Sequence, residues 1–340
     1  MRLLSDDGSR GRSPRGLILL YHRVAELPAD PQLLAVTPRR FAQHLELLRR
    51  HCCPTSLGQL VATLGEGRLP RRAVAVTFDD GYADNLHVAE PLLARYDVPA
   101  TVFVTTAYVG SARELWWDDL ERLLLFPGEL PETLRVRIGP VVETWQLGPS
   151  AVLTPEDCAS HADWNVECGH DPSARHRVYR DLCGRLRTVS SDDREAVFAD
   201  LSRMAGMNAE GRATHRALSR DEVGRLAESD HIDIGAHTMT HPVLSGLPVA
   251  VQQSEVAGSK ARLEAITKRR VTSFAYPFGG RADYTRSTVS LVRNAGFTTA
   301  CANVAGLVRR RSDPWQLPRV LVRNLDADAF AGRLREWFGD

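Results

Sequence analysis

The stretch that decides the fold reads Val74-Ala75-Val76-Thr77-Phe78-Asp79-Asp80-Gly81-Tyr82. Residues 73–78 are apolar on both faces rather than alternating, which is typical of a strand buried inside a parallel sheet. Two adjacent carboxylates and a glycine end this strand, at the position where parallel α/β folds hold their ligands. Neighbouring carboxylates repel each other unless a cation lies between them or one stays protonated. The stretch therefore indicates either a cation site or a turn that Asp79 caps.

Six further apolar segments are separated by amphipathic segments that predict helices, and this rhythm is typical of parallel strands joined by right-handed crossovers. We therefore expect an α/β fold, a distorted seven-stranded (β/α) barrel. The predicted strands cover residues 16–21, 73–78, 100–105, 232–236, 272–276, 298–302 and 317–321.

Two segments do not follow the barrel rhythm. Residues 1–15 are polar and rich in Arg, Ser and Gly, and are predicted to form a disordered tail. Residues 113–218 contain mainly polar helices and a hairpin around Gly139-Pro140, with little apolar content. We interpret them as an inserted, mainly helical subdomain of a barrel domain that covers residues 16–340.

The composition limits the possible partners and compartments. The formal charge of +1 over 340 residues provides no basic surface, so nucleic acid is not an expected partner. No apolar run approaches the ~20 residues of a membrane span, and the N-terminus lacks the apolar core of a signal peptide. We therefore expect a cytoplasmic protein without an integral membrane segment, whose six cysteines are reduced. The composition does not indicate an oligomeric state.

A second polar motif, His237-Thr238-Met239-Thr240-His241, follows the strand predicted over residues 232–236. Histidines at positions i and i+4 of a helix share one face and can bind one metal ion together, although such pairs also occur by chance. Two imidazoles and one carboxylate leave coordination positions open for water, as in catalytic zinc sites. The second carboxylate would then be free to act as a general base.

Three motifs in this order resemble the polysaccharide deacetylases of carbohydrate esterase family 4: residues 77–82, 237–241, and Phe274-Ala275-Tyr276-Pro277-Phe278-Gly279. The resemblance covers residues 16–112 and 219–323. It implies a metal-dependent hydrolase that removes N-acetyl groups from N-acetylated sugars, oligosaccharides or polysaccharides of the exopolysaccharide or cell-wall type. It also implies one divalent metal ion per chain, with zinc as the first choice.

The resemblance also implies a role for each motif residue. Asp79 would be the catalytic base, and the backbone N–H of Phe278 would help to hold the oxyanion. The metal ligands would be Asp80, His237 and His241.

The sequence departs from the family pattern at two positions. Many members have an arginine two residues before the proline of the third motif, where this chain has Ala275. Arg319 or Arg23 could replace it. The family's late histidine, which supplies the general acid, is also absent, because no histidine follows His241. We expect His22, at the end of the first strand, to be this acid; alternatively it is a structural residue or a further metal ligand.

Other interpretations stay open. The same metal site could hydrolyse a non-sugar amide or an O-acetyl ester, or the barrel could bind carbohydrate with impaired catalysis. Trp116 and Trp117 could form a sugar-stacking platform or anchor the first helix of the insertion. A second zinc site in the insertion is conceivable, although its spacing fits no standard pattern; it would involve Cys158, His161, Cys168, His170 and His176.

Overall fold

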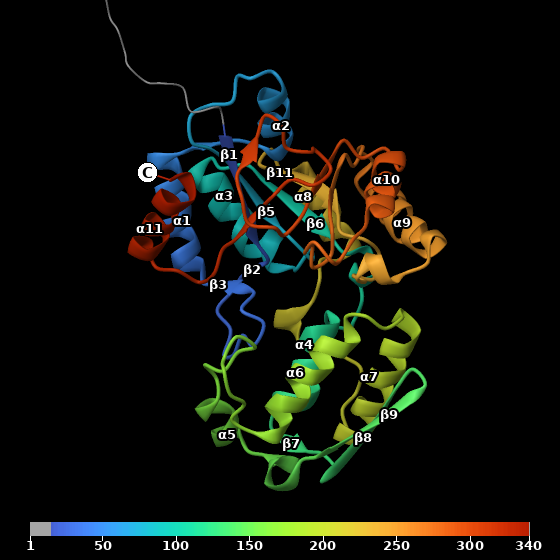
Figure 1. The fold of residues 1–340 in the computed structure, drawn as a ribbon. Coiled ribbons are helices and arrows are strands. Elements are labelled where there is room, and N and C mark those ends of the chain that lie inside the picture. Colours follow the sequence, from blue (N-terminus) through green and yellow to red (C-terminus); the bar gives the residue numbers. More distant parts are fainter. Residues whose placement is uncertain (1–14, 340) are drawn as a thin grey trace, which may run out of the picture.

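Parallel strands form a strongly curled central sheet in the computed structural model, which describes residues 15–339 (Figure 1). All seven predicted strands belong to it, so the predicted barrel is confirmed. The predicted tail lies outside the described residues except for Arg15, which begins the first strand. The seven strands are β1 (Arg15–Tyr21), β5 (Ala73–Phe78), β6 (Ala100–Val104), β11 (Ile232–Ala236), β12 (Ser273–Ala275), β13 (Thr299–Cys301) and β15 (Val320–Leu321).

The ring of strands is completed by its last and shortest member. From β13 the sheet runs through β12, β11, β6 and β5 to β1, and each neighbouring pair is parallel. Leu317 forms a parallel bridge with Cys301 of β13, and β15 pairs in parallel with β1. The segment 317–321 therefore lies between β13 and β1. Pro318 shortens this strand because it lacks an N–H for the ladder.

Two short strands and a small separate pair complete the strands of the barrel part. Strand β4 (Cys53–Pro54) lies beside β5, and β14 (Val308–Arg309) is antiparallel to β1. Strands β2 (Arg23–Val24) and β3 (Ala35–Val36) pair in the loop that follows β1.

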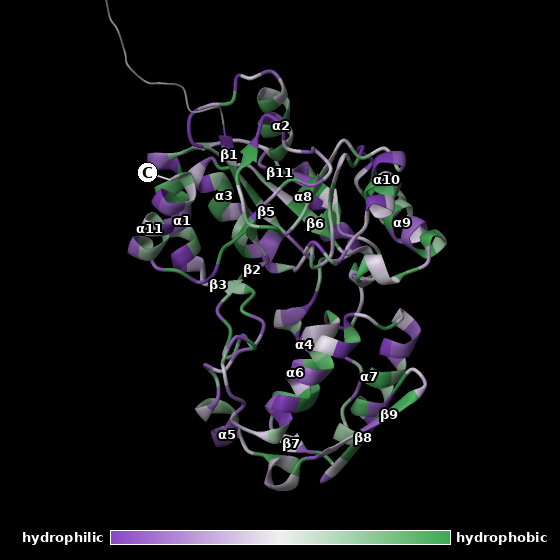
Figure 2. Cartoon of the chain, viewed as in Figure 1, coloured by the Kyte–Doolittle hydropathy of each residue, from purple (hydrophilic) through white to green (hydrophobic). Residues whose placement is uncertain are grey.

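Seven α-helices surround the sheet: α1 (Pro38–His51), α2 (Leu57–Gly65), α3 (Glu90–Tyr96), α8 (Arg220–Glu228), α9 (Val249–Thr267), α10 (Arg286–Asn294) and α11 (Ala327–Phe338). Their sequences contain residues that typically begin a helix. In α1, for example, the Thr37 hydroxyl accepts a hydrogen bond from the Arg40 N–H, and Pro38 lies in the first turn. Figure 2 shows both hydrophobic and hydrophilic residues along the helices.

The predicted helix over residues 84–96 is divided in the structure. A π-helical turn (Asn85–Ala89) runs directly into α3, and Pro91, which has no N–H to donate to the preceding turn, lies just after this junction. None of the helices described between residues 15 and 339 is long and apolar enough to cross a bilayer.

Most residues between β6 and β11, although not those of α8, form a second lobe, below the barrel in Figure 1. This lobe has its own cluster of buried apolar side chains around Leu120, Tyr179 and Phe198. The polar composition of the segment conceals this cluster because its apolar residues are distributed over several helices and strand β8. Its elements are α4 (Trp116–Leu125), β7 (Gly128–Glu129), β8 (Thr133–Ile138), β9 (Val141–Gln146), β10 (Val152–Leu153), α5 (Pro155–Ser160), α6 (Ala174–Leu186) and α7 (Ser191–Ala205). The boundaries 113 and 218 stay a prediction.

Candidate active site

The carboxyl ends of the strands and the lobe between β6 and β11 together line a pocket of about 540 Å³. Because parallel strands end at the same edge of the sheet, the residues that follow β1, β5, β11 and β12 meet there. Helices α4 and α6 supply the opposite wall. The residues from the strand ends are His22, Asp79, Asp80, His237, His241 and Phe278, and those from the helices include Trp116, Trp117 and Cys183.

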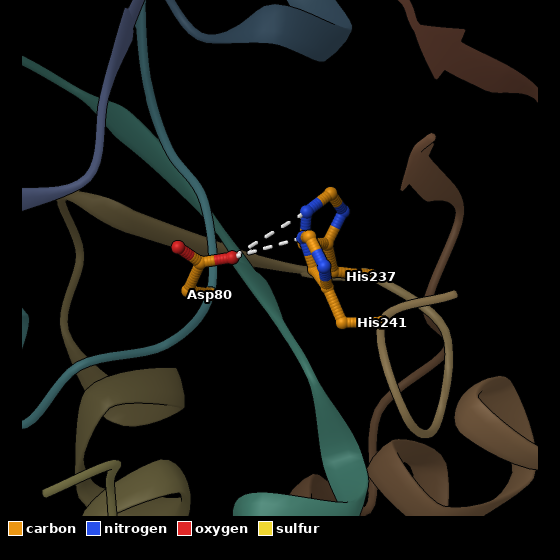
Figure 3. Close-up of side chains that lie close together, drawn as sticks. All are labelled: Asp80, His237 and His241. Carbon is orange, nitrogen blue, oxygen red and sulfur yellow. Dashed lines mark ion pairs between the residues drawn. The ribbon is translucent and has the colours of Figure 1, made fainter. Parts of the chain in front are cut away.

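Three of these side chains form a group that could hold a metal ion (Figure 3). The Oδ1 atom of Asp80 lies 3.6 Å from Nε2 of His237 and 3.4 Å from Nε2 of His241. All three residues are buried. Within residues 15–339, Asp80 Oδ1 has no hydrogen-bond partner. A buried carboxylate oxygen without a partner is costly, and two imidazoles with one carboxylate are a common ligand set for a divalent ion. The residues therefore fit such an ion.

The electrostatics of the group also suit a cation. Burial, reinforced by the neighbouring Asp79 and Asp118, raises the pKa of Asp80 well above its usual range. Burial lowers the pKa of both His237 and His241, so both imidazoles are in the neutral form that binds metals. Nδ1 of His237 lies 2.8 Å from the carbonyl oxygen of Ala275. Donation to this carbonyl leaves Nε2 of His237 free to face Asp80.

The two histidines do not lie on one helical face, so that part of the prediction is wrong. Residues 237–241 form an irregular loop after β11, in which Thr238 and His241 have left-handed φ angles of 62° and 58°. Asp80 is also left-handed, with φ of 76°, and Gly81 follows at 79°. A Cβ atom on Gly81 would lie 3.0 Å from Cγ1 of Val104, so only glycine fits there. Such strained backbone occurs where a site fixes its side chains precisely.

Arg319 is the arginine that contacts Asp79. Its Nη1 and Nη2 atoms donate to Oδ1 and Oδ2 of Asp79, both at 2.7 Å, and its Nε donates to the carbonyl of Ala302. Burial alone would raise the pKa of Asp79, but Arg319, aided by His237, holds it below its usual value. The other candidate, Arg23, instead forms an ion pair with Asp84 at 3.0 Å.

Phe278 lies at the pocket with its main chain in the left-handed region (φ 59°). Among the described residues its backbone N–H donates no hydrogen bond, so it is free to face a ligand. Arg187, at the end of α6, lies 4.3 Å above the Phe278 ring and forms an ion pair with Asp283 at 2.8 Å. These contacts connect the second lobe to the barrel across the pocket. The sequence reasoning did not identify Arg187 or Asp283, because no local pattern marks a contact between segments so distant.

His22 lines the same pocket, as predicted for a residue at the end of β1. Its electrostatics do not favour the predicted role. A general acid works best with a pKa near the working pH, but burial lowers the pKa of His22 to about 4. Asp79 does raise the pKa, but Arg319 and His237 act in the opposite direction. His22 is therefore neutral at pH 7.

Two other groups of potential ligands do not resemble the first. Asp118, Glu121 and His215 lie close together, but Arg212 forms an ion pair with Glu121 at 3.0 Å. We interpret that group as a buried charge network. Within residues 15–339, the cysteines and histidines of the conceivable second zinc site form no group of three metal-ligating atoms. Two of them, His161 and His176, pack edge to face with ring centroids 5.1 Å apart.

Comparisons with known proteins agree with this fold. IcaB from Ammonifex degensii has the same fold, with a TM-score of 0.58 and 19% identity over 96% of this chain and 97% of that one. The deacetylase PplD of Streptococcus pyogenes, solved in complex with acetate, gives a TM-score of 0.54 and 16% identity over 95% of this chain and 99% of the other.

Sequence comparisons identify the family. The poly-beta-1,6-N-acetyl-D-glucosamine N-deacetylase of Staphylococcus epidermidis is 31% identical over 110 residues, which cover 28% of this chain and 37% of that protein. The curated relatives are thus matched over little more than a third of their length. The family model for polysaccharide deacetylase matches residues 66–129 and 186–300, more than half of the chain. The protein therefore belongs to the polysaccharide deacetylase family.

Proposed function

We propose that this protein is a metal-dependent hydrolase that removes N-acetyl groups from an N-acetylated glycan. The observation that carries the proposal is the juxtaposition of a buried two-histidine, one-carboxylate group with a second carboxylate, Asp79, that Arg319 holds in its charged form. The name of the Staphylococcus epidermidis relative supports a polymer of N-acetylglucosamine as the substrate.

Asp80, His237 and His241 would hold the metal ion. Zinc is our first choice because this ligand set occurs in catalytic zinc sites, although nitrogen and oxygen ligands do not select one divalent ion by affinity alone. When bound, such an ion would polarise an amide carbonyl and lower the pKa of a water molecule. Because the three ligands line the pocket, an ion held by them would be accessible to a substrate there.

The chain's own residues would perform the remaining steps. Asp79 accepts the proton from the attacking water, since the pKa of its carboxylate is held low and it is ionised at neutral pH. The N–H of Phe278 donates to the acetamide oxygen as negative charge develops there. One such donor typically contributes ~3 kcal/mol to the transition state. Acetate and a free amine on the sugar are the products.

The leaving amine needs a proton, and His22 is our candidate donor. Because burial lowers the pKa of His22 to about 4, it is neutral before the reaction. It would therefore act only after it takes up the proton that Asp79 has removed from water. The alternative is that Asp79 returns this proton to the amine directly.

The proposal is tested by measuring acetate release from a panel of substrates, after chelation and again after zinc is restored. The panel contains poly-β-1,6-N-acetylglucosamine oligomers, chitin oligomers, an O-acetylated glycan and a non-sugar acetamide. Zinc-dependent release from the N-acetylated glycans, absent in Asp79→Asn, is the expected result.

Other outcomes identify the alternatives. Release from the O-acetylated glycan or the acetamide alone would indicate another hydrolase on the same metal site. Binding of glycan oligomers without any release would indicate a carbohydrate-binding barrel. Release that is unaffected by chelation would contradict metal dependence.

A further inference from the structure

The two histidines of the proposed metal site are oriented by different means. A histidine that binds a metal ion ordinarily donates its second ring N–H to a carboxylate or carbonyl, which fixes the ring. His237 has such a partner, the carbonyl of Ala275, 2.8 Å from its Nδ1 atom. Nδ1 of His241 is buried and has no hydrogen-bond partner among the described residues.

Aromatic rings surround the imidazole of His241 instead. The ring of Trp117 lies 4.8 Å from it at 66°, the ring of Phe278 lies 4.8 Å away at 70°, and His237 lies 4.9 Å away. All three contacts are edge-to-face. The orientation of the His241 ring, and hence the direction of its Nε2 atom toward Asp80, therefore depends on packing against these three rings.

Trp117 is itself anchored to the segment that carries Asp80. Its indole Nε1 donates to the hydroxyl of Tyr82 at 2.8 Å, and that hydroxyl donates to Oδ2 of Asp118 at 2.7 Å. Tyr82 is fully buried and lies two residues after Asp80. The segment from Asp80 to Tyr82 thus supplies the carboxylate ligand directly. Through the hydrogen bond of Tyr82 it also holds the Trp117 ring, which orients the histidine ligand.

Trp117 comes from α4 (Trp116–Leu125), the first helix of the lobe between β6 and β11, and not from the barrel strands. We propose that Trp117 is a positioning residue for His241 and that this lobe is thereby part of the metal centre. The inference rests on the proposed metal site. It assigns a role to the hydrogen bond from Trp117 to Tyr82.

The test measures metal affinity and ligand geometry rather than turnover. Trp117→Phe keeps an aromatic ring against His241 but removes the indole N–H, and Tyr82→Phe removes its acceptor. Zinc affinity is measured on the chelator-treated full chain by competition with a chromophoric chelator, and the absorption spectrum of the Co²⁺ form reports the coordination geometry. Circular dichroism checks that each variant is folded.

We expect each single variant to bind zinc about 10- to 100-fold more weakly and to have an altered Co²⁺ spectrum, as when the partner of a ligand is lost. The zinc affinity of the double variant should equal that of the single variant that binds zinc less tightly, because both changes break the same hydrogen bond. If Trp117→Phe does not fold, the zinc affinity of Tyr82→Phe alone decides the test.

The matched control is Trp145→Phe. Trp145 lies in the same lobe and donates its indole N–H to Asp181 at 3.1 Å, but it does not line the pocket. The Trp145→Phe variant should bind zinc with the same affinity as the unmodified chain. Unchanged affinity and spectrum in Trp117→Phe and Tyr82→Phe, or an equal loss in Trp145→Phe, would overturn the inference. An unmodified chain that binds no metal would instead refute the proposed function.

Discussion

Arg319 and Asp79 face each other through two parallel hydrogen bonds of 2.7 Å, although 240 residues separate them along the chain. Both side chains are buried. The guanidinium fork matches the carboxylate geometry, and the positive charge offsets the cost of burying the negative one. The pair therefore determines both where the proposed base lies and at what pH it is ionised.

Replacing Arg319 should shift the proposed deacetylase activity toward higher pH. Arg319 holds the pKa of Asp79 below its usual value against the effect of burial, so in Arg319→Gln burial dominates and the pKa rises. The acid limb of the pH–rate profile should move to higher pH, with a smaller shift in Arg319→Lys, which keeps the charge without the fork. Thermal unfolding should show a loss of about 3–5 kcal/mol in Arg319→Gln, because a buried charge loses its partner.

The control for this experiment is Arg333→Gln. Arg333 forms an exposed ion pair with Glu336, so its removal should cost less than about 1 kcal/mol and leave the pH profile unchanged. An acid limb that stays in place in Arg319→Gln would show that Asp79 is not the group that sets it.

The two adjacent aspartates should differ in their effect on metal content. Asp79→Asn should abolish turnover while metal binding is largely kept, because the base is not among the three ligands. Asp80→Asn should weaken metal binding first, since it removes a ligand. Metal content after dialysis, measured by mass spectrometry, distinguishes the two. Equal metal loss in both variants would refute this division of roles.

Metal binding should release a proton and weaken as the pH falls. Burial, Asp79 and Asp118 raise the pKa of Asp80 well above its usual range, so a metal ion that binds this carboxylate competes with a proton at higher pH than at an ordinary aspartate. The two histidines have lowered pKa values and add no proton at neutral pH. Calorimetry in buffers of different ionisation enthalpy should show net proton release on zinc binding, and this release should grow as the pH is lowered.

Asp79→Asn provides an internal check on that prediction. Because the charge of Asp79 raises the pKa of Asp80, its removal should move the pH dependence of metal affinity to lower pH. An affinity that does not vary between about pH 5 and 7 would contradict the assignment of the titrating group to Asp80.

His22→Gln distinguishes the two routes for the final proton. If His22 passes the proton to the amine, turnover should fall about 10²- to 10⁴-fold while metal content stays unchanged. A fall of less than about threefold would indicate that Asp79 returns the proton itself. Loss of metal together with activity would show that His22 is a further ligand rather than the acid.

The sequence predicted those features that leave a local pattern. The continuous apolar run over residues 73–78 defined β5, and the two aspartates at its end lie at the pocket as expected. The strands predicted over residues 272–276 and 317–321 are shorter in the structure. Pro318 explains the shortening of the second of these strands, because proline cannot donate to a ladder.

The remaining features depend on tertiary structure. Thr238 and His241 have left-handed φ angles, which the sequence does not indicate because neither residue is a glycine. A helix was therefore expected where a strained loop occurs. The choice between Arg319 and Arg23 required knowing which strands are neighbours. The lowered pKa of His22 results from burial, which the position of a residue at a strand end does not reveal.

The order of the segments along the chain has a consequence for biosynthesis. During translation, the Asp79 segment and both histidines emerge from the ribosome before Arg319, which lies on the last segment of the ring. Until that segment docks, the buried carboxylate of Asp79 lacks its counter-charge, so the nascent barrel should remain open or loosely packed at this edge. A ribosome stalled before residue 319 should therefore present a chain that proteases readily digest.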